Sequence, residues 1–303
     1  MSAPLRLGTR RSALAMAQAG GVAATLLALT GRDVELVEIT TRGDVDPGSI
    51  VEIGGTGVFV SALRDAVLGG DIDFAVHSLK DLPTVSADGL VLAAVPPRED
   101  PRDVLCSPAG LTIAELPTGS RIGTGSPRRA AQLRALGLGL DIVPIRGNVD
   151  TRLKKAIDGE VDAVVLARAG LARLDRLDAV SEVLDPTQML PAPGQGALAV
   201  ECRVDDDDVH RLLGMLDDAD TRACVTAERA LLAALEAGCT APVGALADVS
   251  DDELYLRAVV CTLDGSADVR RSLTGPVEDP TGLGGRLAAL LLEDGAALLM
   301  GER

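Results

Sequence analysis

The chain has 303 residues, a net charge of −16, 47% hydrophobic residues and 24% charged residues. Trp is absent and the aromatic residues are Phe59, Phe74 and Tyr255, so the cores must be aliphatic. The length allows two or three domains, and the acidic balance with so few aromatic side chains argues against nucleic acid as a partner.

Short apolar strands alternate with helical patterns in the first part of the chain. We predict strands at 5–8, 34–40 and 74–76, with helices over about 12–29 and 58–68. Residues 42–57 contain six glycines or prolines and are expected to form a mobile loop.

An N-terminal export signal is the alternative for this region. Thr9-Arg10-Arg11-Ser12 precedes an uncharged run, which superficially resembles a twin-arginine signal. A strand at 5–8 feeding a helix with one apolar face, formed by Leu14, Ala17, Val22, Leu26 and Leu29, favours a mature α/β domain. The run is also too polar and too small to indicate a membrane span clearly, so we expect no membrane partner.

Two turn-rich crossings divide the rest of the chain. Residues 96–101 precede strands at 122, 142–145 and 161–166, and residues 191–196 precede an apolar run at 197–200. A chain that leaves and returns predicts domain 1 in 1–96 with 197–216 and domain 2 in 97–196. A helix over 221–237 capped by Gly238, strands at 243–246, 254–261 and 269–273, and a helix over 283–292 predict a small α+β domain in 217–303.

Five cysteines are spread along the chain: Cys106, Cys202, Cys224, Cys239 and Cys261. An odd number without a C-x-x-C pair indicates neither a disulfide framework nor a zinc site, so we predict no metal. Reduced thiols are typical of the cytoplasm, which is the expected location. Cys239 lies in a turn with small neighbours that would leave its thiol accessible, whereas the other four fit core positions.

The segment 121–155 carries eight basic and two acidic residues. Such a concentration in an acidic chain favours an anionic partner, although a solvated basic face would also explain it. Gly125-Ser126-Pro127 has the pattern of a helix start, whose free amides favour an anion. Arginines suited to carboxylates or phosphates follow this and neighbouring strand ends: Arg128, Arg129, Arg146, Arg152 and Arg173.

A second polar segment, 77–83 (HSLKDLP), follows the buried-looking strand at 74–76. Asp81 is suited to act as an acid, a base or a stabiliser of a cation, and Lys80 to bind anionic groups. An Asx-type turn would account for Asp81 equally well, and His77 is expected to be structural.

Taken together, several segments resemble the porphobilinogen deaminase (hydroxymethylbilane synthase) family. They are residues 8–12 (GTRRS), 77–83 (HSLKDLP), 127–129 (PRR), 146–153 (RGNVDTRL) and 238–244 (GCTAPVG), with further likeness at 98–103, 169–174, 190–197 and 226–229. The match runs in order over nearly the whole chain.

The resemblance implies a fold and an activity. The fold would be two periplasmic-binding-protein-like α/β domains plus a small α+β C-terminal domain. The activity would be that of a transferase of porphyrin, tetrapyrrole and heme biosynthesis: it deaminates four porphobilinogen molecules, condenses them head to tail on a covalent dipyrromethane cofactor, and releases hydroxymethylbilane by hydrolysis.

The resemblance also implies residue roles. Cys239 would hold the dipyrromethane through a thioether, and Asp81 would assist loss of ammonia and stabilise the resulting cation. Phe59 would cover the growing chain from the active-site loop. The cofactor and substrate carboxylates would be bound by Arg10, Arg11, Ser12, Lys80, Arg128, Arg129, Arg146, Arg152, Arg173 and Gln195.

The sequence departs from the family pattern at two places. Glu52 and Thr56 stand where many relatives carry lysines, and Gly125 stands where many carry a serine. The alternative function is a periplasmic-type carboxylate-binding module without catalysis. It would explain the arginines but neither Cys239 nor a third domain.

We expect the protein to be a monomer that acts on a small molecule.

Overall fold

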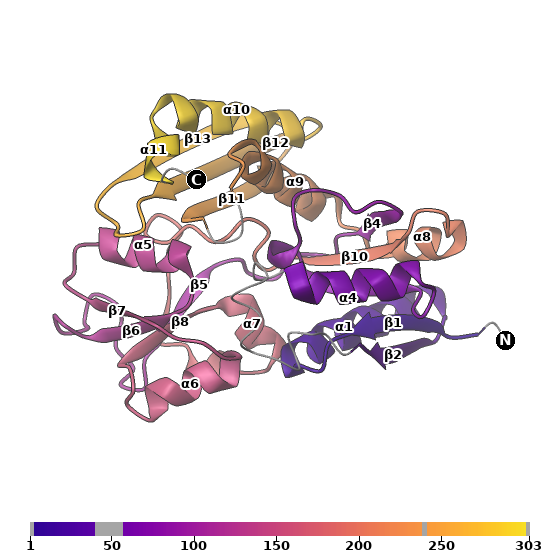
Figure 1. The fold of residues 1–303 in the computed structure, drawn as a ribbon, viewed down its shortest axis with the longest axis horizontal. Coiled ribbons are helices and arrows are strands. Elements are labelled where there is room, and N and C mark those ends of the chain that lie inside the picture. Colours follow the sequence, from indigo (N-terminus) through magenta and orange to yellow (C-terminus); the bar gives the residue numbers. More distant parts are fainter. Residues whose placement is uncertain (1–2, 40–56, 238–240, 301–303) are drawn as a thin grey trace. The chain divides into compact units, whose positions relative to one another are not determined.

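The computed structural model describes residues 3–39, 57–237 and 241–300, and in the helix that begins at Gly57 it describes the side chains from Val60 onward. The chain forms two compact units, residues 1–98 with 197–222 and residues 99–196 with 223–303 (Figure 1). The predicted boundaries of three domains stay predictions.

The first unit is a five-stranded sheet in the order β2-β1-β3-β10-β4. Strands β1 (Leu5–Thr9), β2 (Val34–Glu38) and β3 (Phe74–Ser78) are parallel, whereas β10 (Leu198–Arg203) runs antiparallel to β3 and to β4 (Leu90–Ala94). Helices α1 (Ala13–Thr30) and α8 (Asp207–Leu213) share one core with one face of the sheet, and α4 (Gly57–Leu68) packs against the other. A short turn, η3 (Gly214–Leu216), follows α8.

Helix α1 begins at its N-cap Ser12, whose hydroxyl accepts a hydrogen bond from the Ala15 amide, and ends at left-handed Gly31. Of the predicted apolar stripe, Val22 and Leu26 are buried, and Leu14 and Ala17 are half-buried; Gln18 and Ala19 are buried as well. Leu29 is 48% exposed, so its predicted place on that stripe is wrong. Among the described residues, α1 is the helix whose length and composition would let it cross a membrane.

The second unit contains another five-stranded sheet, in the order β7-β6-β8-β5-β9. Strands β6 (Arg121–Thr124), β7 (Asp141–Pro144) and β8 (Ala163–Ala167) are parallel, and β5 (Asp103–Cys106) is antiparallel to β8 and β9 (Glu182–Val183). The three helices beside it are α5 (Pro127–Ala135), α6 (Val149–Ile157) and α7 (Arg168–Arg173), with a short turn η2 (Leu177–Ala179). The two five-stranded sheets therefore share one pattern of strand order and direction.

The C-terminal part of the second unit is an antiparallel sheet of β11 (Val243–Ser250), β12 (Glu253–Cys261) and β13 (Asp268–Pro276). It shares a core with α9 (Ala219–Ala234), α10 (Pro280–Glu293) and α11 (Ala296–Leu299). Mixed sheets in two α/β domains with a small α+β domain at the C-terminus confirm the predicted fold class.

Helix α9 ends earlier than the sequence predicts. Its last residue is Ala234, and Glu236, rather than a glycine, adopts the left-handed conformation with φ 48°. The Ala237 amide donates to the Leu232 carbonyl, the six-residue closure of a Schellman-type end. The predicted helix to 237 is therefore wrong at its C-terminal end, and Gly238 lies outside the described residues.

Candidate active site

The carboxyl ends of β1 and β3 and the first turns of α1 enclose a pocket in the first unit. It holds about 610 Å³ of empty space, its mouth included. Since β1 and β3 are adjacent and parallel, their carboxyl ends meet at one edge of the sheet. Six polar residues line the pocket: Arg10, Ser12, Gln18, His77, Ser78 and Asp81.

Asp81 is held in this pocket by a short turn rather than by bonds to its carboxylate. It ends a 3₁₀ turn, η1 (Leu79–Asp81), in which the Leu82 amide donates to the Leu79 carbonyl. The Leu79 amide donates to the Ala197 carbonyl, and the Leu79 side chain is fully buried. Within the described ranges no donor contacts the Asp81 carboxylate, so the alternative of an Asx-type turn is not formed there. Lys80 lies in the same turn but does not line the pocket.

Gln18 and Ser78 both line the pocket, and the sequence motifs did not predict that they contact each other. The Gln18 amide nitrogen donates to the Ser78 hydroxyl at 2.9 Å, and Gln18 is 7% exposed. This bond orients a hydroxyl beside Asp81 at the end of β3. The signal in the sequence was a single glutamine in an otherwise apolar helix.

A buried charge cluster lies behind the pocket. Arg64 on α4 binds Glu201 on β10 through two hydrogen bonds of 2.9 and 2.7 Å. His77 Nε2 lies 3.3 Å from the same carboxylate. Burial alone would raise the pKa of Glu201, but contacts with His77 and Arg64 outweigh it and lower the pKa to about 2. His77 thus has a structural partner, as expected, although it also lines the pocket.

Arg11 lies apart from this pocket. Its side chain is 67% exposed and donates to Glu38 at 3.0 Å, whereas Arg10 and Ser12 both line the cavity. The structure therefore brings together Arg10, Ser12 and Asp81 of the predicted site but not Arg11.

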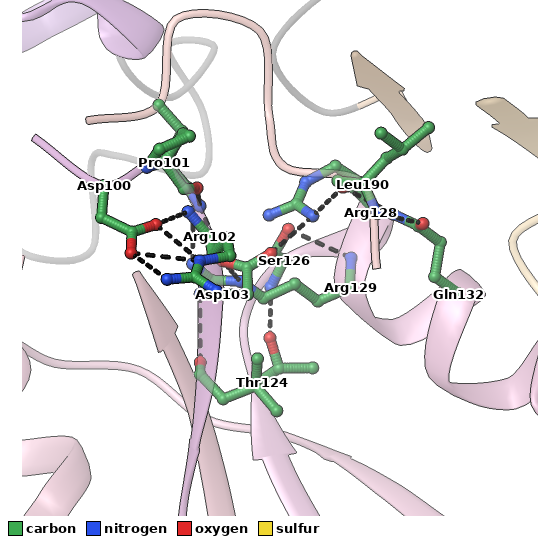
Figure 2. A network of polar contacts seen from close by, with 12 residues as sticks. Asp100, Pro101, Arg102, Asp103, Thr124, Ser126, Arg128, Arg129, Gln132 and Leu190 are labelled. Atoms are coloured by element: carbon green, nitrogen blue, oxygen red, sulfur yellow. Dashed lines mark hydrogen bonds and ion pairs between the residues drawn. The ribbon is translucent and has the colours of Figure 1, made fainter. Parts of the chain in front are cut away.

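In the second unit, Arg128 and Arg129 share one buried carboxylate, that of Asp103 on β5 (Figure 2). Ser126 caps α5 by accepting from the Arg129 amide, and Pro127 occupies its first turn, as predicted. This start places the two arginines, 4% and 5% exposed, against the fully buried Asp103. Burial alone would raise the pKa of Asp103, but the two guanidinium charges outweigh it and hold the pKa well below its usual value.

The two arginines use different edges of their guanidinium groups. Arg129 donates from Nε and Nη2 to Asp103 Oδ1 at 3.0 and 2.8 Å, and from Nη1 to the Val165 carbonyl. Arg128 donates from Nη1 alone, to Asp103 Oδ2 at 2.7 Å and to the Leu190 carbonyl at 2.5 Å. Its Nε is buried and makes no hydrogen bond. Among the described residues, the Nε–Nη2 fork of Arg128 is thus available to a carboxylate.

The cluster carries an excess of positive charge. Two guanidinium groups face one carboxylate, and Gln195, which is fully buried, adds a neutral donor to Asp103 Oδ1 at 2.8 Å. Arg152 lies close enough that burial and the charge of Arg129 lower the pKa of Arg152. A buried net positive charge and an unpaired buried donor are the features that a bound carboxylate would satisfy.

The other predicted binding arginines lie in different surroundings of the second unit. Arg152 Nε donates to the Gly147 carbonyl at 2.8 Å, and Arg173 Nη2 donates to the Gly196 carbonyl at 2.6 Å. Arg146 is exposed and lines a separate hollow with Arg121 and Lys155. The structure therefore does not gather all five arginines of this unit into one cluster.

Gly125 stands beside Arg152, and its backbone leaves no room for a side chain. A Cβ there would lie 2.6 Å from the Ile145 carbonyl oxygen and 3.8 Å from Arg152 Nη2. Glycine therefore stands in place of the serine of many relatives at a point where two backbone segments approach closely.

Four of the five cysteines, Cys106, Cys202, Cys224 and Cys261, are buried, which confirms their predicted core positions. Burial raises the thiol pKa of Cys106 to about 12, and those of Cys202 and Cys261 to about 11. Cys239 lies outside the described residues, as do Glu52 and Thr56, and the side chain of Phe59 is not described. Among the described residues, no group of three or more potential ligands could hold a metal ion.

Comparison with known proteins gives one consistent family. Residues 5–211 match the family model "Porphobilinogen deaminase, dipyromethane cofactor binding domain", and residues 222–293 match "Porphobilinogen deaminase, C-terminal domain". Porphobilinogen deaminase 1 of Streptomyces coelicolor is 59% identical over 99% of this chain and 98% of its own length. Porphobilinogen deaminase of Mycobacterium tuberculosis is 56% identical over 98% of each chain.

Solved structures with a similar arrangement include a periplasmic substrate-binding protein of an ABC transporter from Coxiella burnetii. It is 15% identical, with a TM-score of 0.43, over 70% of this chain and 91% of that one. We draw no conclusion from so distant a likeness. The family models and the relatives, by contrast, cover nearly the whole sequence, and the chain belongs to the porphobilinogen deaminase family.

Proposed function

We propose that this chain is a hydroxymethylbilane synthase. It would deaminate four porphobilinogen molecules, condense them head to tail on a dipyrromethane cofactor attached to Cys239, and release linear hydroxymethylbilane by hydrolysis. One observation supports this activity most directly: the half-buried carboxylate of Asp81 shares a pocket with Arg10, Ser12 and Ser78.

The pocket of the first unit suits the substrate. Porphobilinogen carries an acetate, a propionate and an aminomethyl group on a pyrrole ring. Arg10 and the hydroxyls of Ser12 and Ser78 are donors for the carboxylates, and Leu63, Val60 and Val76 supply an apolar wall for the ring.

Asp81 would act on the charge that develops in the reaction. Its carboxylate would accept a hydrogen bond from the pyrrole N–H and stabilise the azafulvenium-like cation left when ammonia departs. A fixed negative charge in a partly water-excluded pocket acts more strongly on such a cation than it would in bulk water. No donor among the described residues competes for this carboxylate.

The second unit suits the carboxylates of the dipyrromethane. Arg128 offers a free fork, and the cluster of Arg128, Arg129 and Asp103 holds one uncompensated positive charge. When bound, the dipyrromethane would supply the pyrrole carbon to which the first substrate unit is joined. Arg152, whose pKa is lowered by burial and by Arg129, would gain from the same negative charge.

Cys239 is the attachment point that the family resemblance implies. The other four thiols are buried, and for Cys106, Cys202 and Cys261 a raised pKa disfavours the thiolate. This supports Cys239 as the one that forms the thioether. A cytoplasmic monomer stays a prediction.

Intact-mass measurement combined with turnover tests the proposal. Protein purified from cells that supply porphobilinogen should exceed its sequence mass by a two-pyrrole adduct and should form hydroxymethylbilane. Cys239→Ser should lack both the adduct and the turnover, whereas Cys224→Ala, a control in the core of the same unit, should keep the adduct. A folded wild-type protein without adduct or turnover would refute the proposal and favour a carboxylate-binding module.

A further inference from the structure

We propose that Asp103 is a positioning residue, which sets the direction of Arg128 and Arg129 so that Arg128 presents its fork to a ligand carboxylate. The inference rests on the proposed function, because it assigns the ligand to the dipyrromethane and the growing pyrrole chain. Asp103 would not itself contact either of them.

The contacts of Asp103 divide the two guanidinium groups into unequal roles. Oδ1 accepts from Nε and Nη2 of Arg129, so that the fork edge of Arg129 is occupied. Oδ2 accepts from Nη1 of Arg128, which leaves Nε and Nη2 of that residue without a hydrogen bond to any described residue. The Asp103 carboxylate therefore occupies the Nε–Nη2 edge of Arg129 and leaves the same edge of Arg128 open (Figure 2).

The surrounding backbone fixes the same arrangement. The Leu190 carbonyl accepts from Arg128 Nη1 at 2.5 Å and from Gln132 Nε2 at 3.0 Å, while Gln132 also accepts from the Leu190 amide. Gln195 donates to both the Pro101 carbonyl and Asp103 Oδ1. The Leu190 carbonyl thus helps to hold Arg128, and Gln195 helps to hold Asp103.

The negative charge of Asp103 also helps to position the two arginines. Without it, two guanidinium groups buried to 95% or more would face each other with no counter-charge, and their repulsion would drive them apart. With it, the excess is one positive charge. That is enough to attract a carboxylate, and the two arginines stay side by side.

Asp103→Asn separates these roles from simple packing. Asparagine has the same shape and keeps one acceptor oxygen, but it has no charge and replaces the other oxygen with an NH2 group, whose two donors would face an arginine that needs an acceptor. The control is Asp100→Asn. Asp100 pairs with Arg102 at 2.6 Å in the same unit, where the two side chains are 18% and 43% exposed, and it contacts neither Arg128 nor Arg129.

The test compares wild type, Asp103→Asn and Asp100→Asn, all made in the same cells. Folded protein is collected by size-exclusion chromatography, and its intact mass is measured. The ratio of adduct-bearing to bare protein should fall at least tenfold in Asp103→Asn and stay within twofold of wild type in Asp100→Asn. Equal loading of the two variants would overturn the role of Asp103. Absence of the adduct from wild type would refute the proposed function instead.

A second variant covers failure of Asp103→Asn to fold. Asp103→Glu keeps the charge and both acceptors but shifts them by one methylene, so it moves the fork of Arg128. It should keep the adduct and raise KM for porphobilinogen at least fivefold with a smaller change in kcat. An unchanged KM would contradict the positioning role.

Discussion

Replacing Glu201 by glutamine tests the buried charge cluster behind the pocket of the first unit. Glu201 binds Arg64 through both carboxylate oxygens and lies 3.3 Å from His77 Nε2. The side chains of Arg64, Glu201 and His77 are 14%, 7% and 4% exposed, so water replaces little of what is lost. Glutamine keeps the shape and removes the charge.

The expected loss follows from these contacts. Removing one partner of a buried ion pair costs about 3–5 kcal/mol, because the other charge stays buried and unpaired. The glutamine oxygen still accepts one hydrogen bond, worth about 1 kcal/mol. We therefore expect the local free energy of opening to fall by about 3 kcal/mol, which is about a hundredfold in the opening equilibrium.

Amide hydrogen exchange of β3 and β10 measures this locally, which matters because a chain of two units need not unfold in one step. Exchange should become about a hundredfold faster in Glu201→Gln. Glu38→Gln is the matched control, because Glu38 pairs with Arg11 where the side chains are 50% and 67% exposed, and it should change exchange less than about fivefold. A Glu201→Gln effect no larger than that of the control would refute the reasoning.

Three further predictions concern the site and its frame. Asp81→Asn should lower turnover by at least about a hundredfold while the two-pyrrole adduct remains visible by mass; retained turnover would remove Asp81 from the mechanism. Gly196→Ala should destabilise the second unit by about 2 kcal/mol, measured by exchange of β5, because φ is +88° and a Cβ would lie 2.3 Å from the Glu99 oxygen. Glu201 has a pKa lowered to about 2 from 4.5, so its stabilisation is complete above pH 4.5 and is lost as the pH falls through about 2. Exchange of β3 and β10, corrected for the intrinsic rate, should show this loss in wild type but not in Glu201→Gln.

The sequence predicted most strands but missed β4, although its residues are all apolar, and the short strands β5 and β9. Strand β3 is buried over four of its five residues and was found. Strand β5 begins with the charged residue Asp103 after a turn-rich segment, and no local pattern marks it. The burial of Asp103 is accompanied by ion pairs with Arg128 and Arg129, which come from a different element, so the sequence near Asp103 does not indicate that this residue is buried in a strand.

The common pattern of the two α/β sheets was also invisible in the sequence. In the first sheet the antiparallel strand β10 follows the parallel strands in the chain, whereas in the second β5 precedes them. Equivalent strands therefore occur in a different order along the chain, and no fixed period relates them. The likeness of the two sheets therefore lies in the direction and the neighbours of each strand, and not in the spacing of the strands along the sequence.

Motifs located single residues of the site better than their grouping. In the first unit, β1 and β3 are adjacent and parallel, and Arg10 and Asp81, which follow their carboxyl ends, line one pocket. The same rule, applied to the second unit, grouped five arginines that the structure separates, because Arg146 faces another hollow and Arg173 binds a backbone carbonyl. Strand ends predict an edge of the sheet, but side-chain partners decide which residues share a site.

The basic residues of the stretch 121–155 include an exposed group and a buried group, which have different explanations. Lys154 and Lys155 pair with Asp158 and Glu160 near the surface, which is the solvated face that a charge run often forms. Arg128 and Arg129 are buried with a single carboxylate, and burying ion pairs is at best a weak source of stability. A fold alone would gain as much from apolar residues there. The buried excess of positive charge and the open fork of Arg128 are therefore best accounted for by a carboxylate ligand.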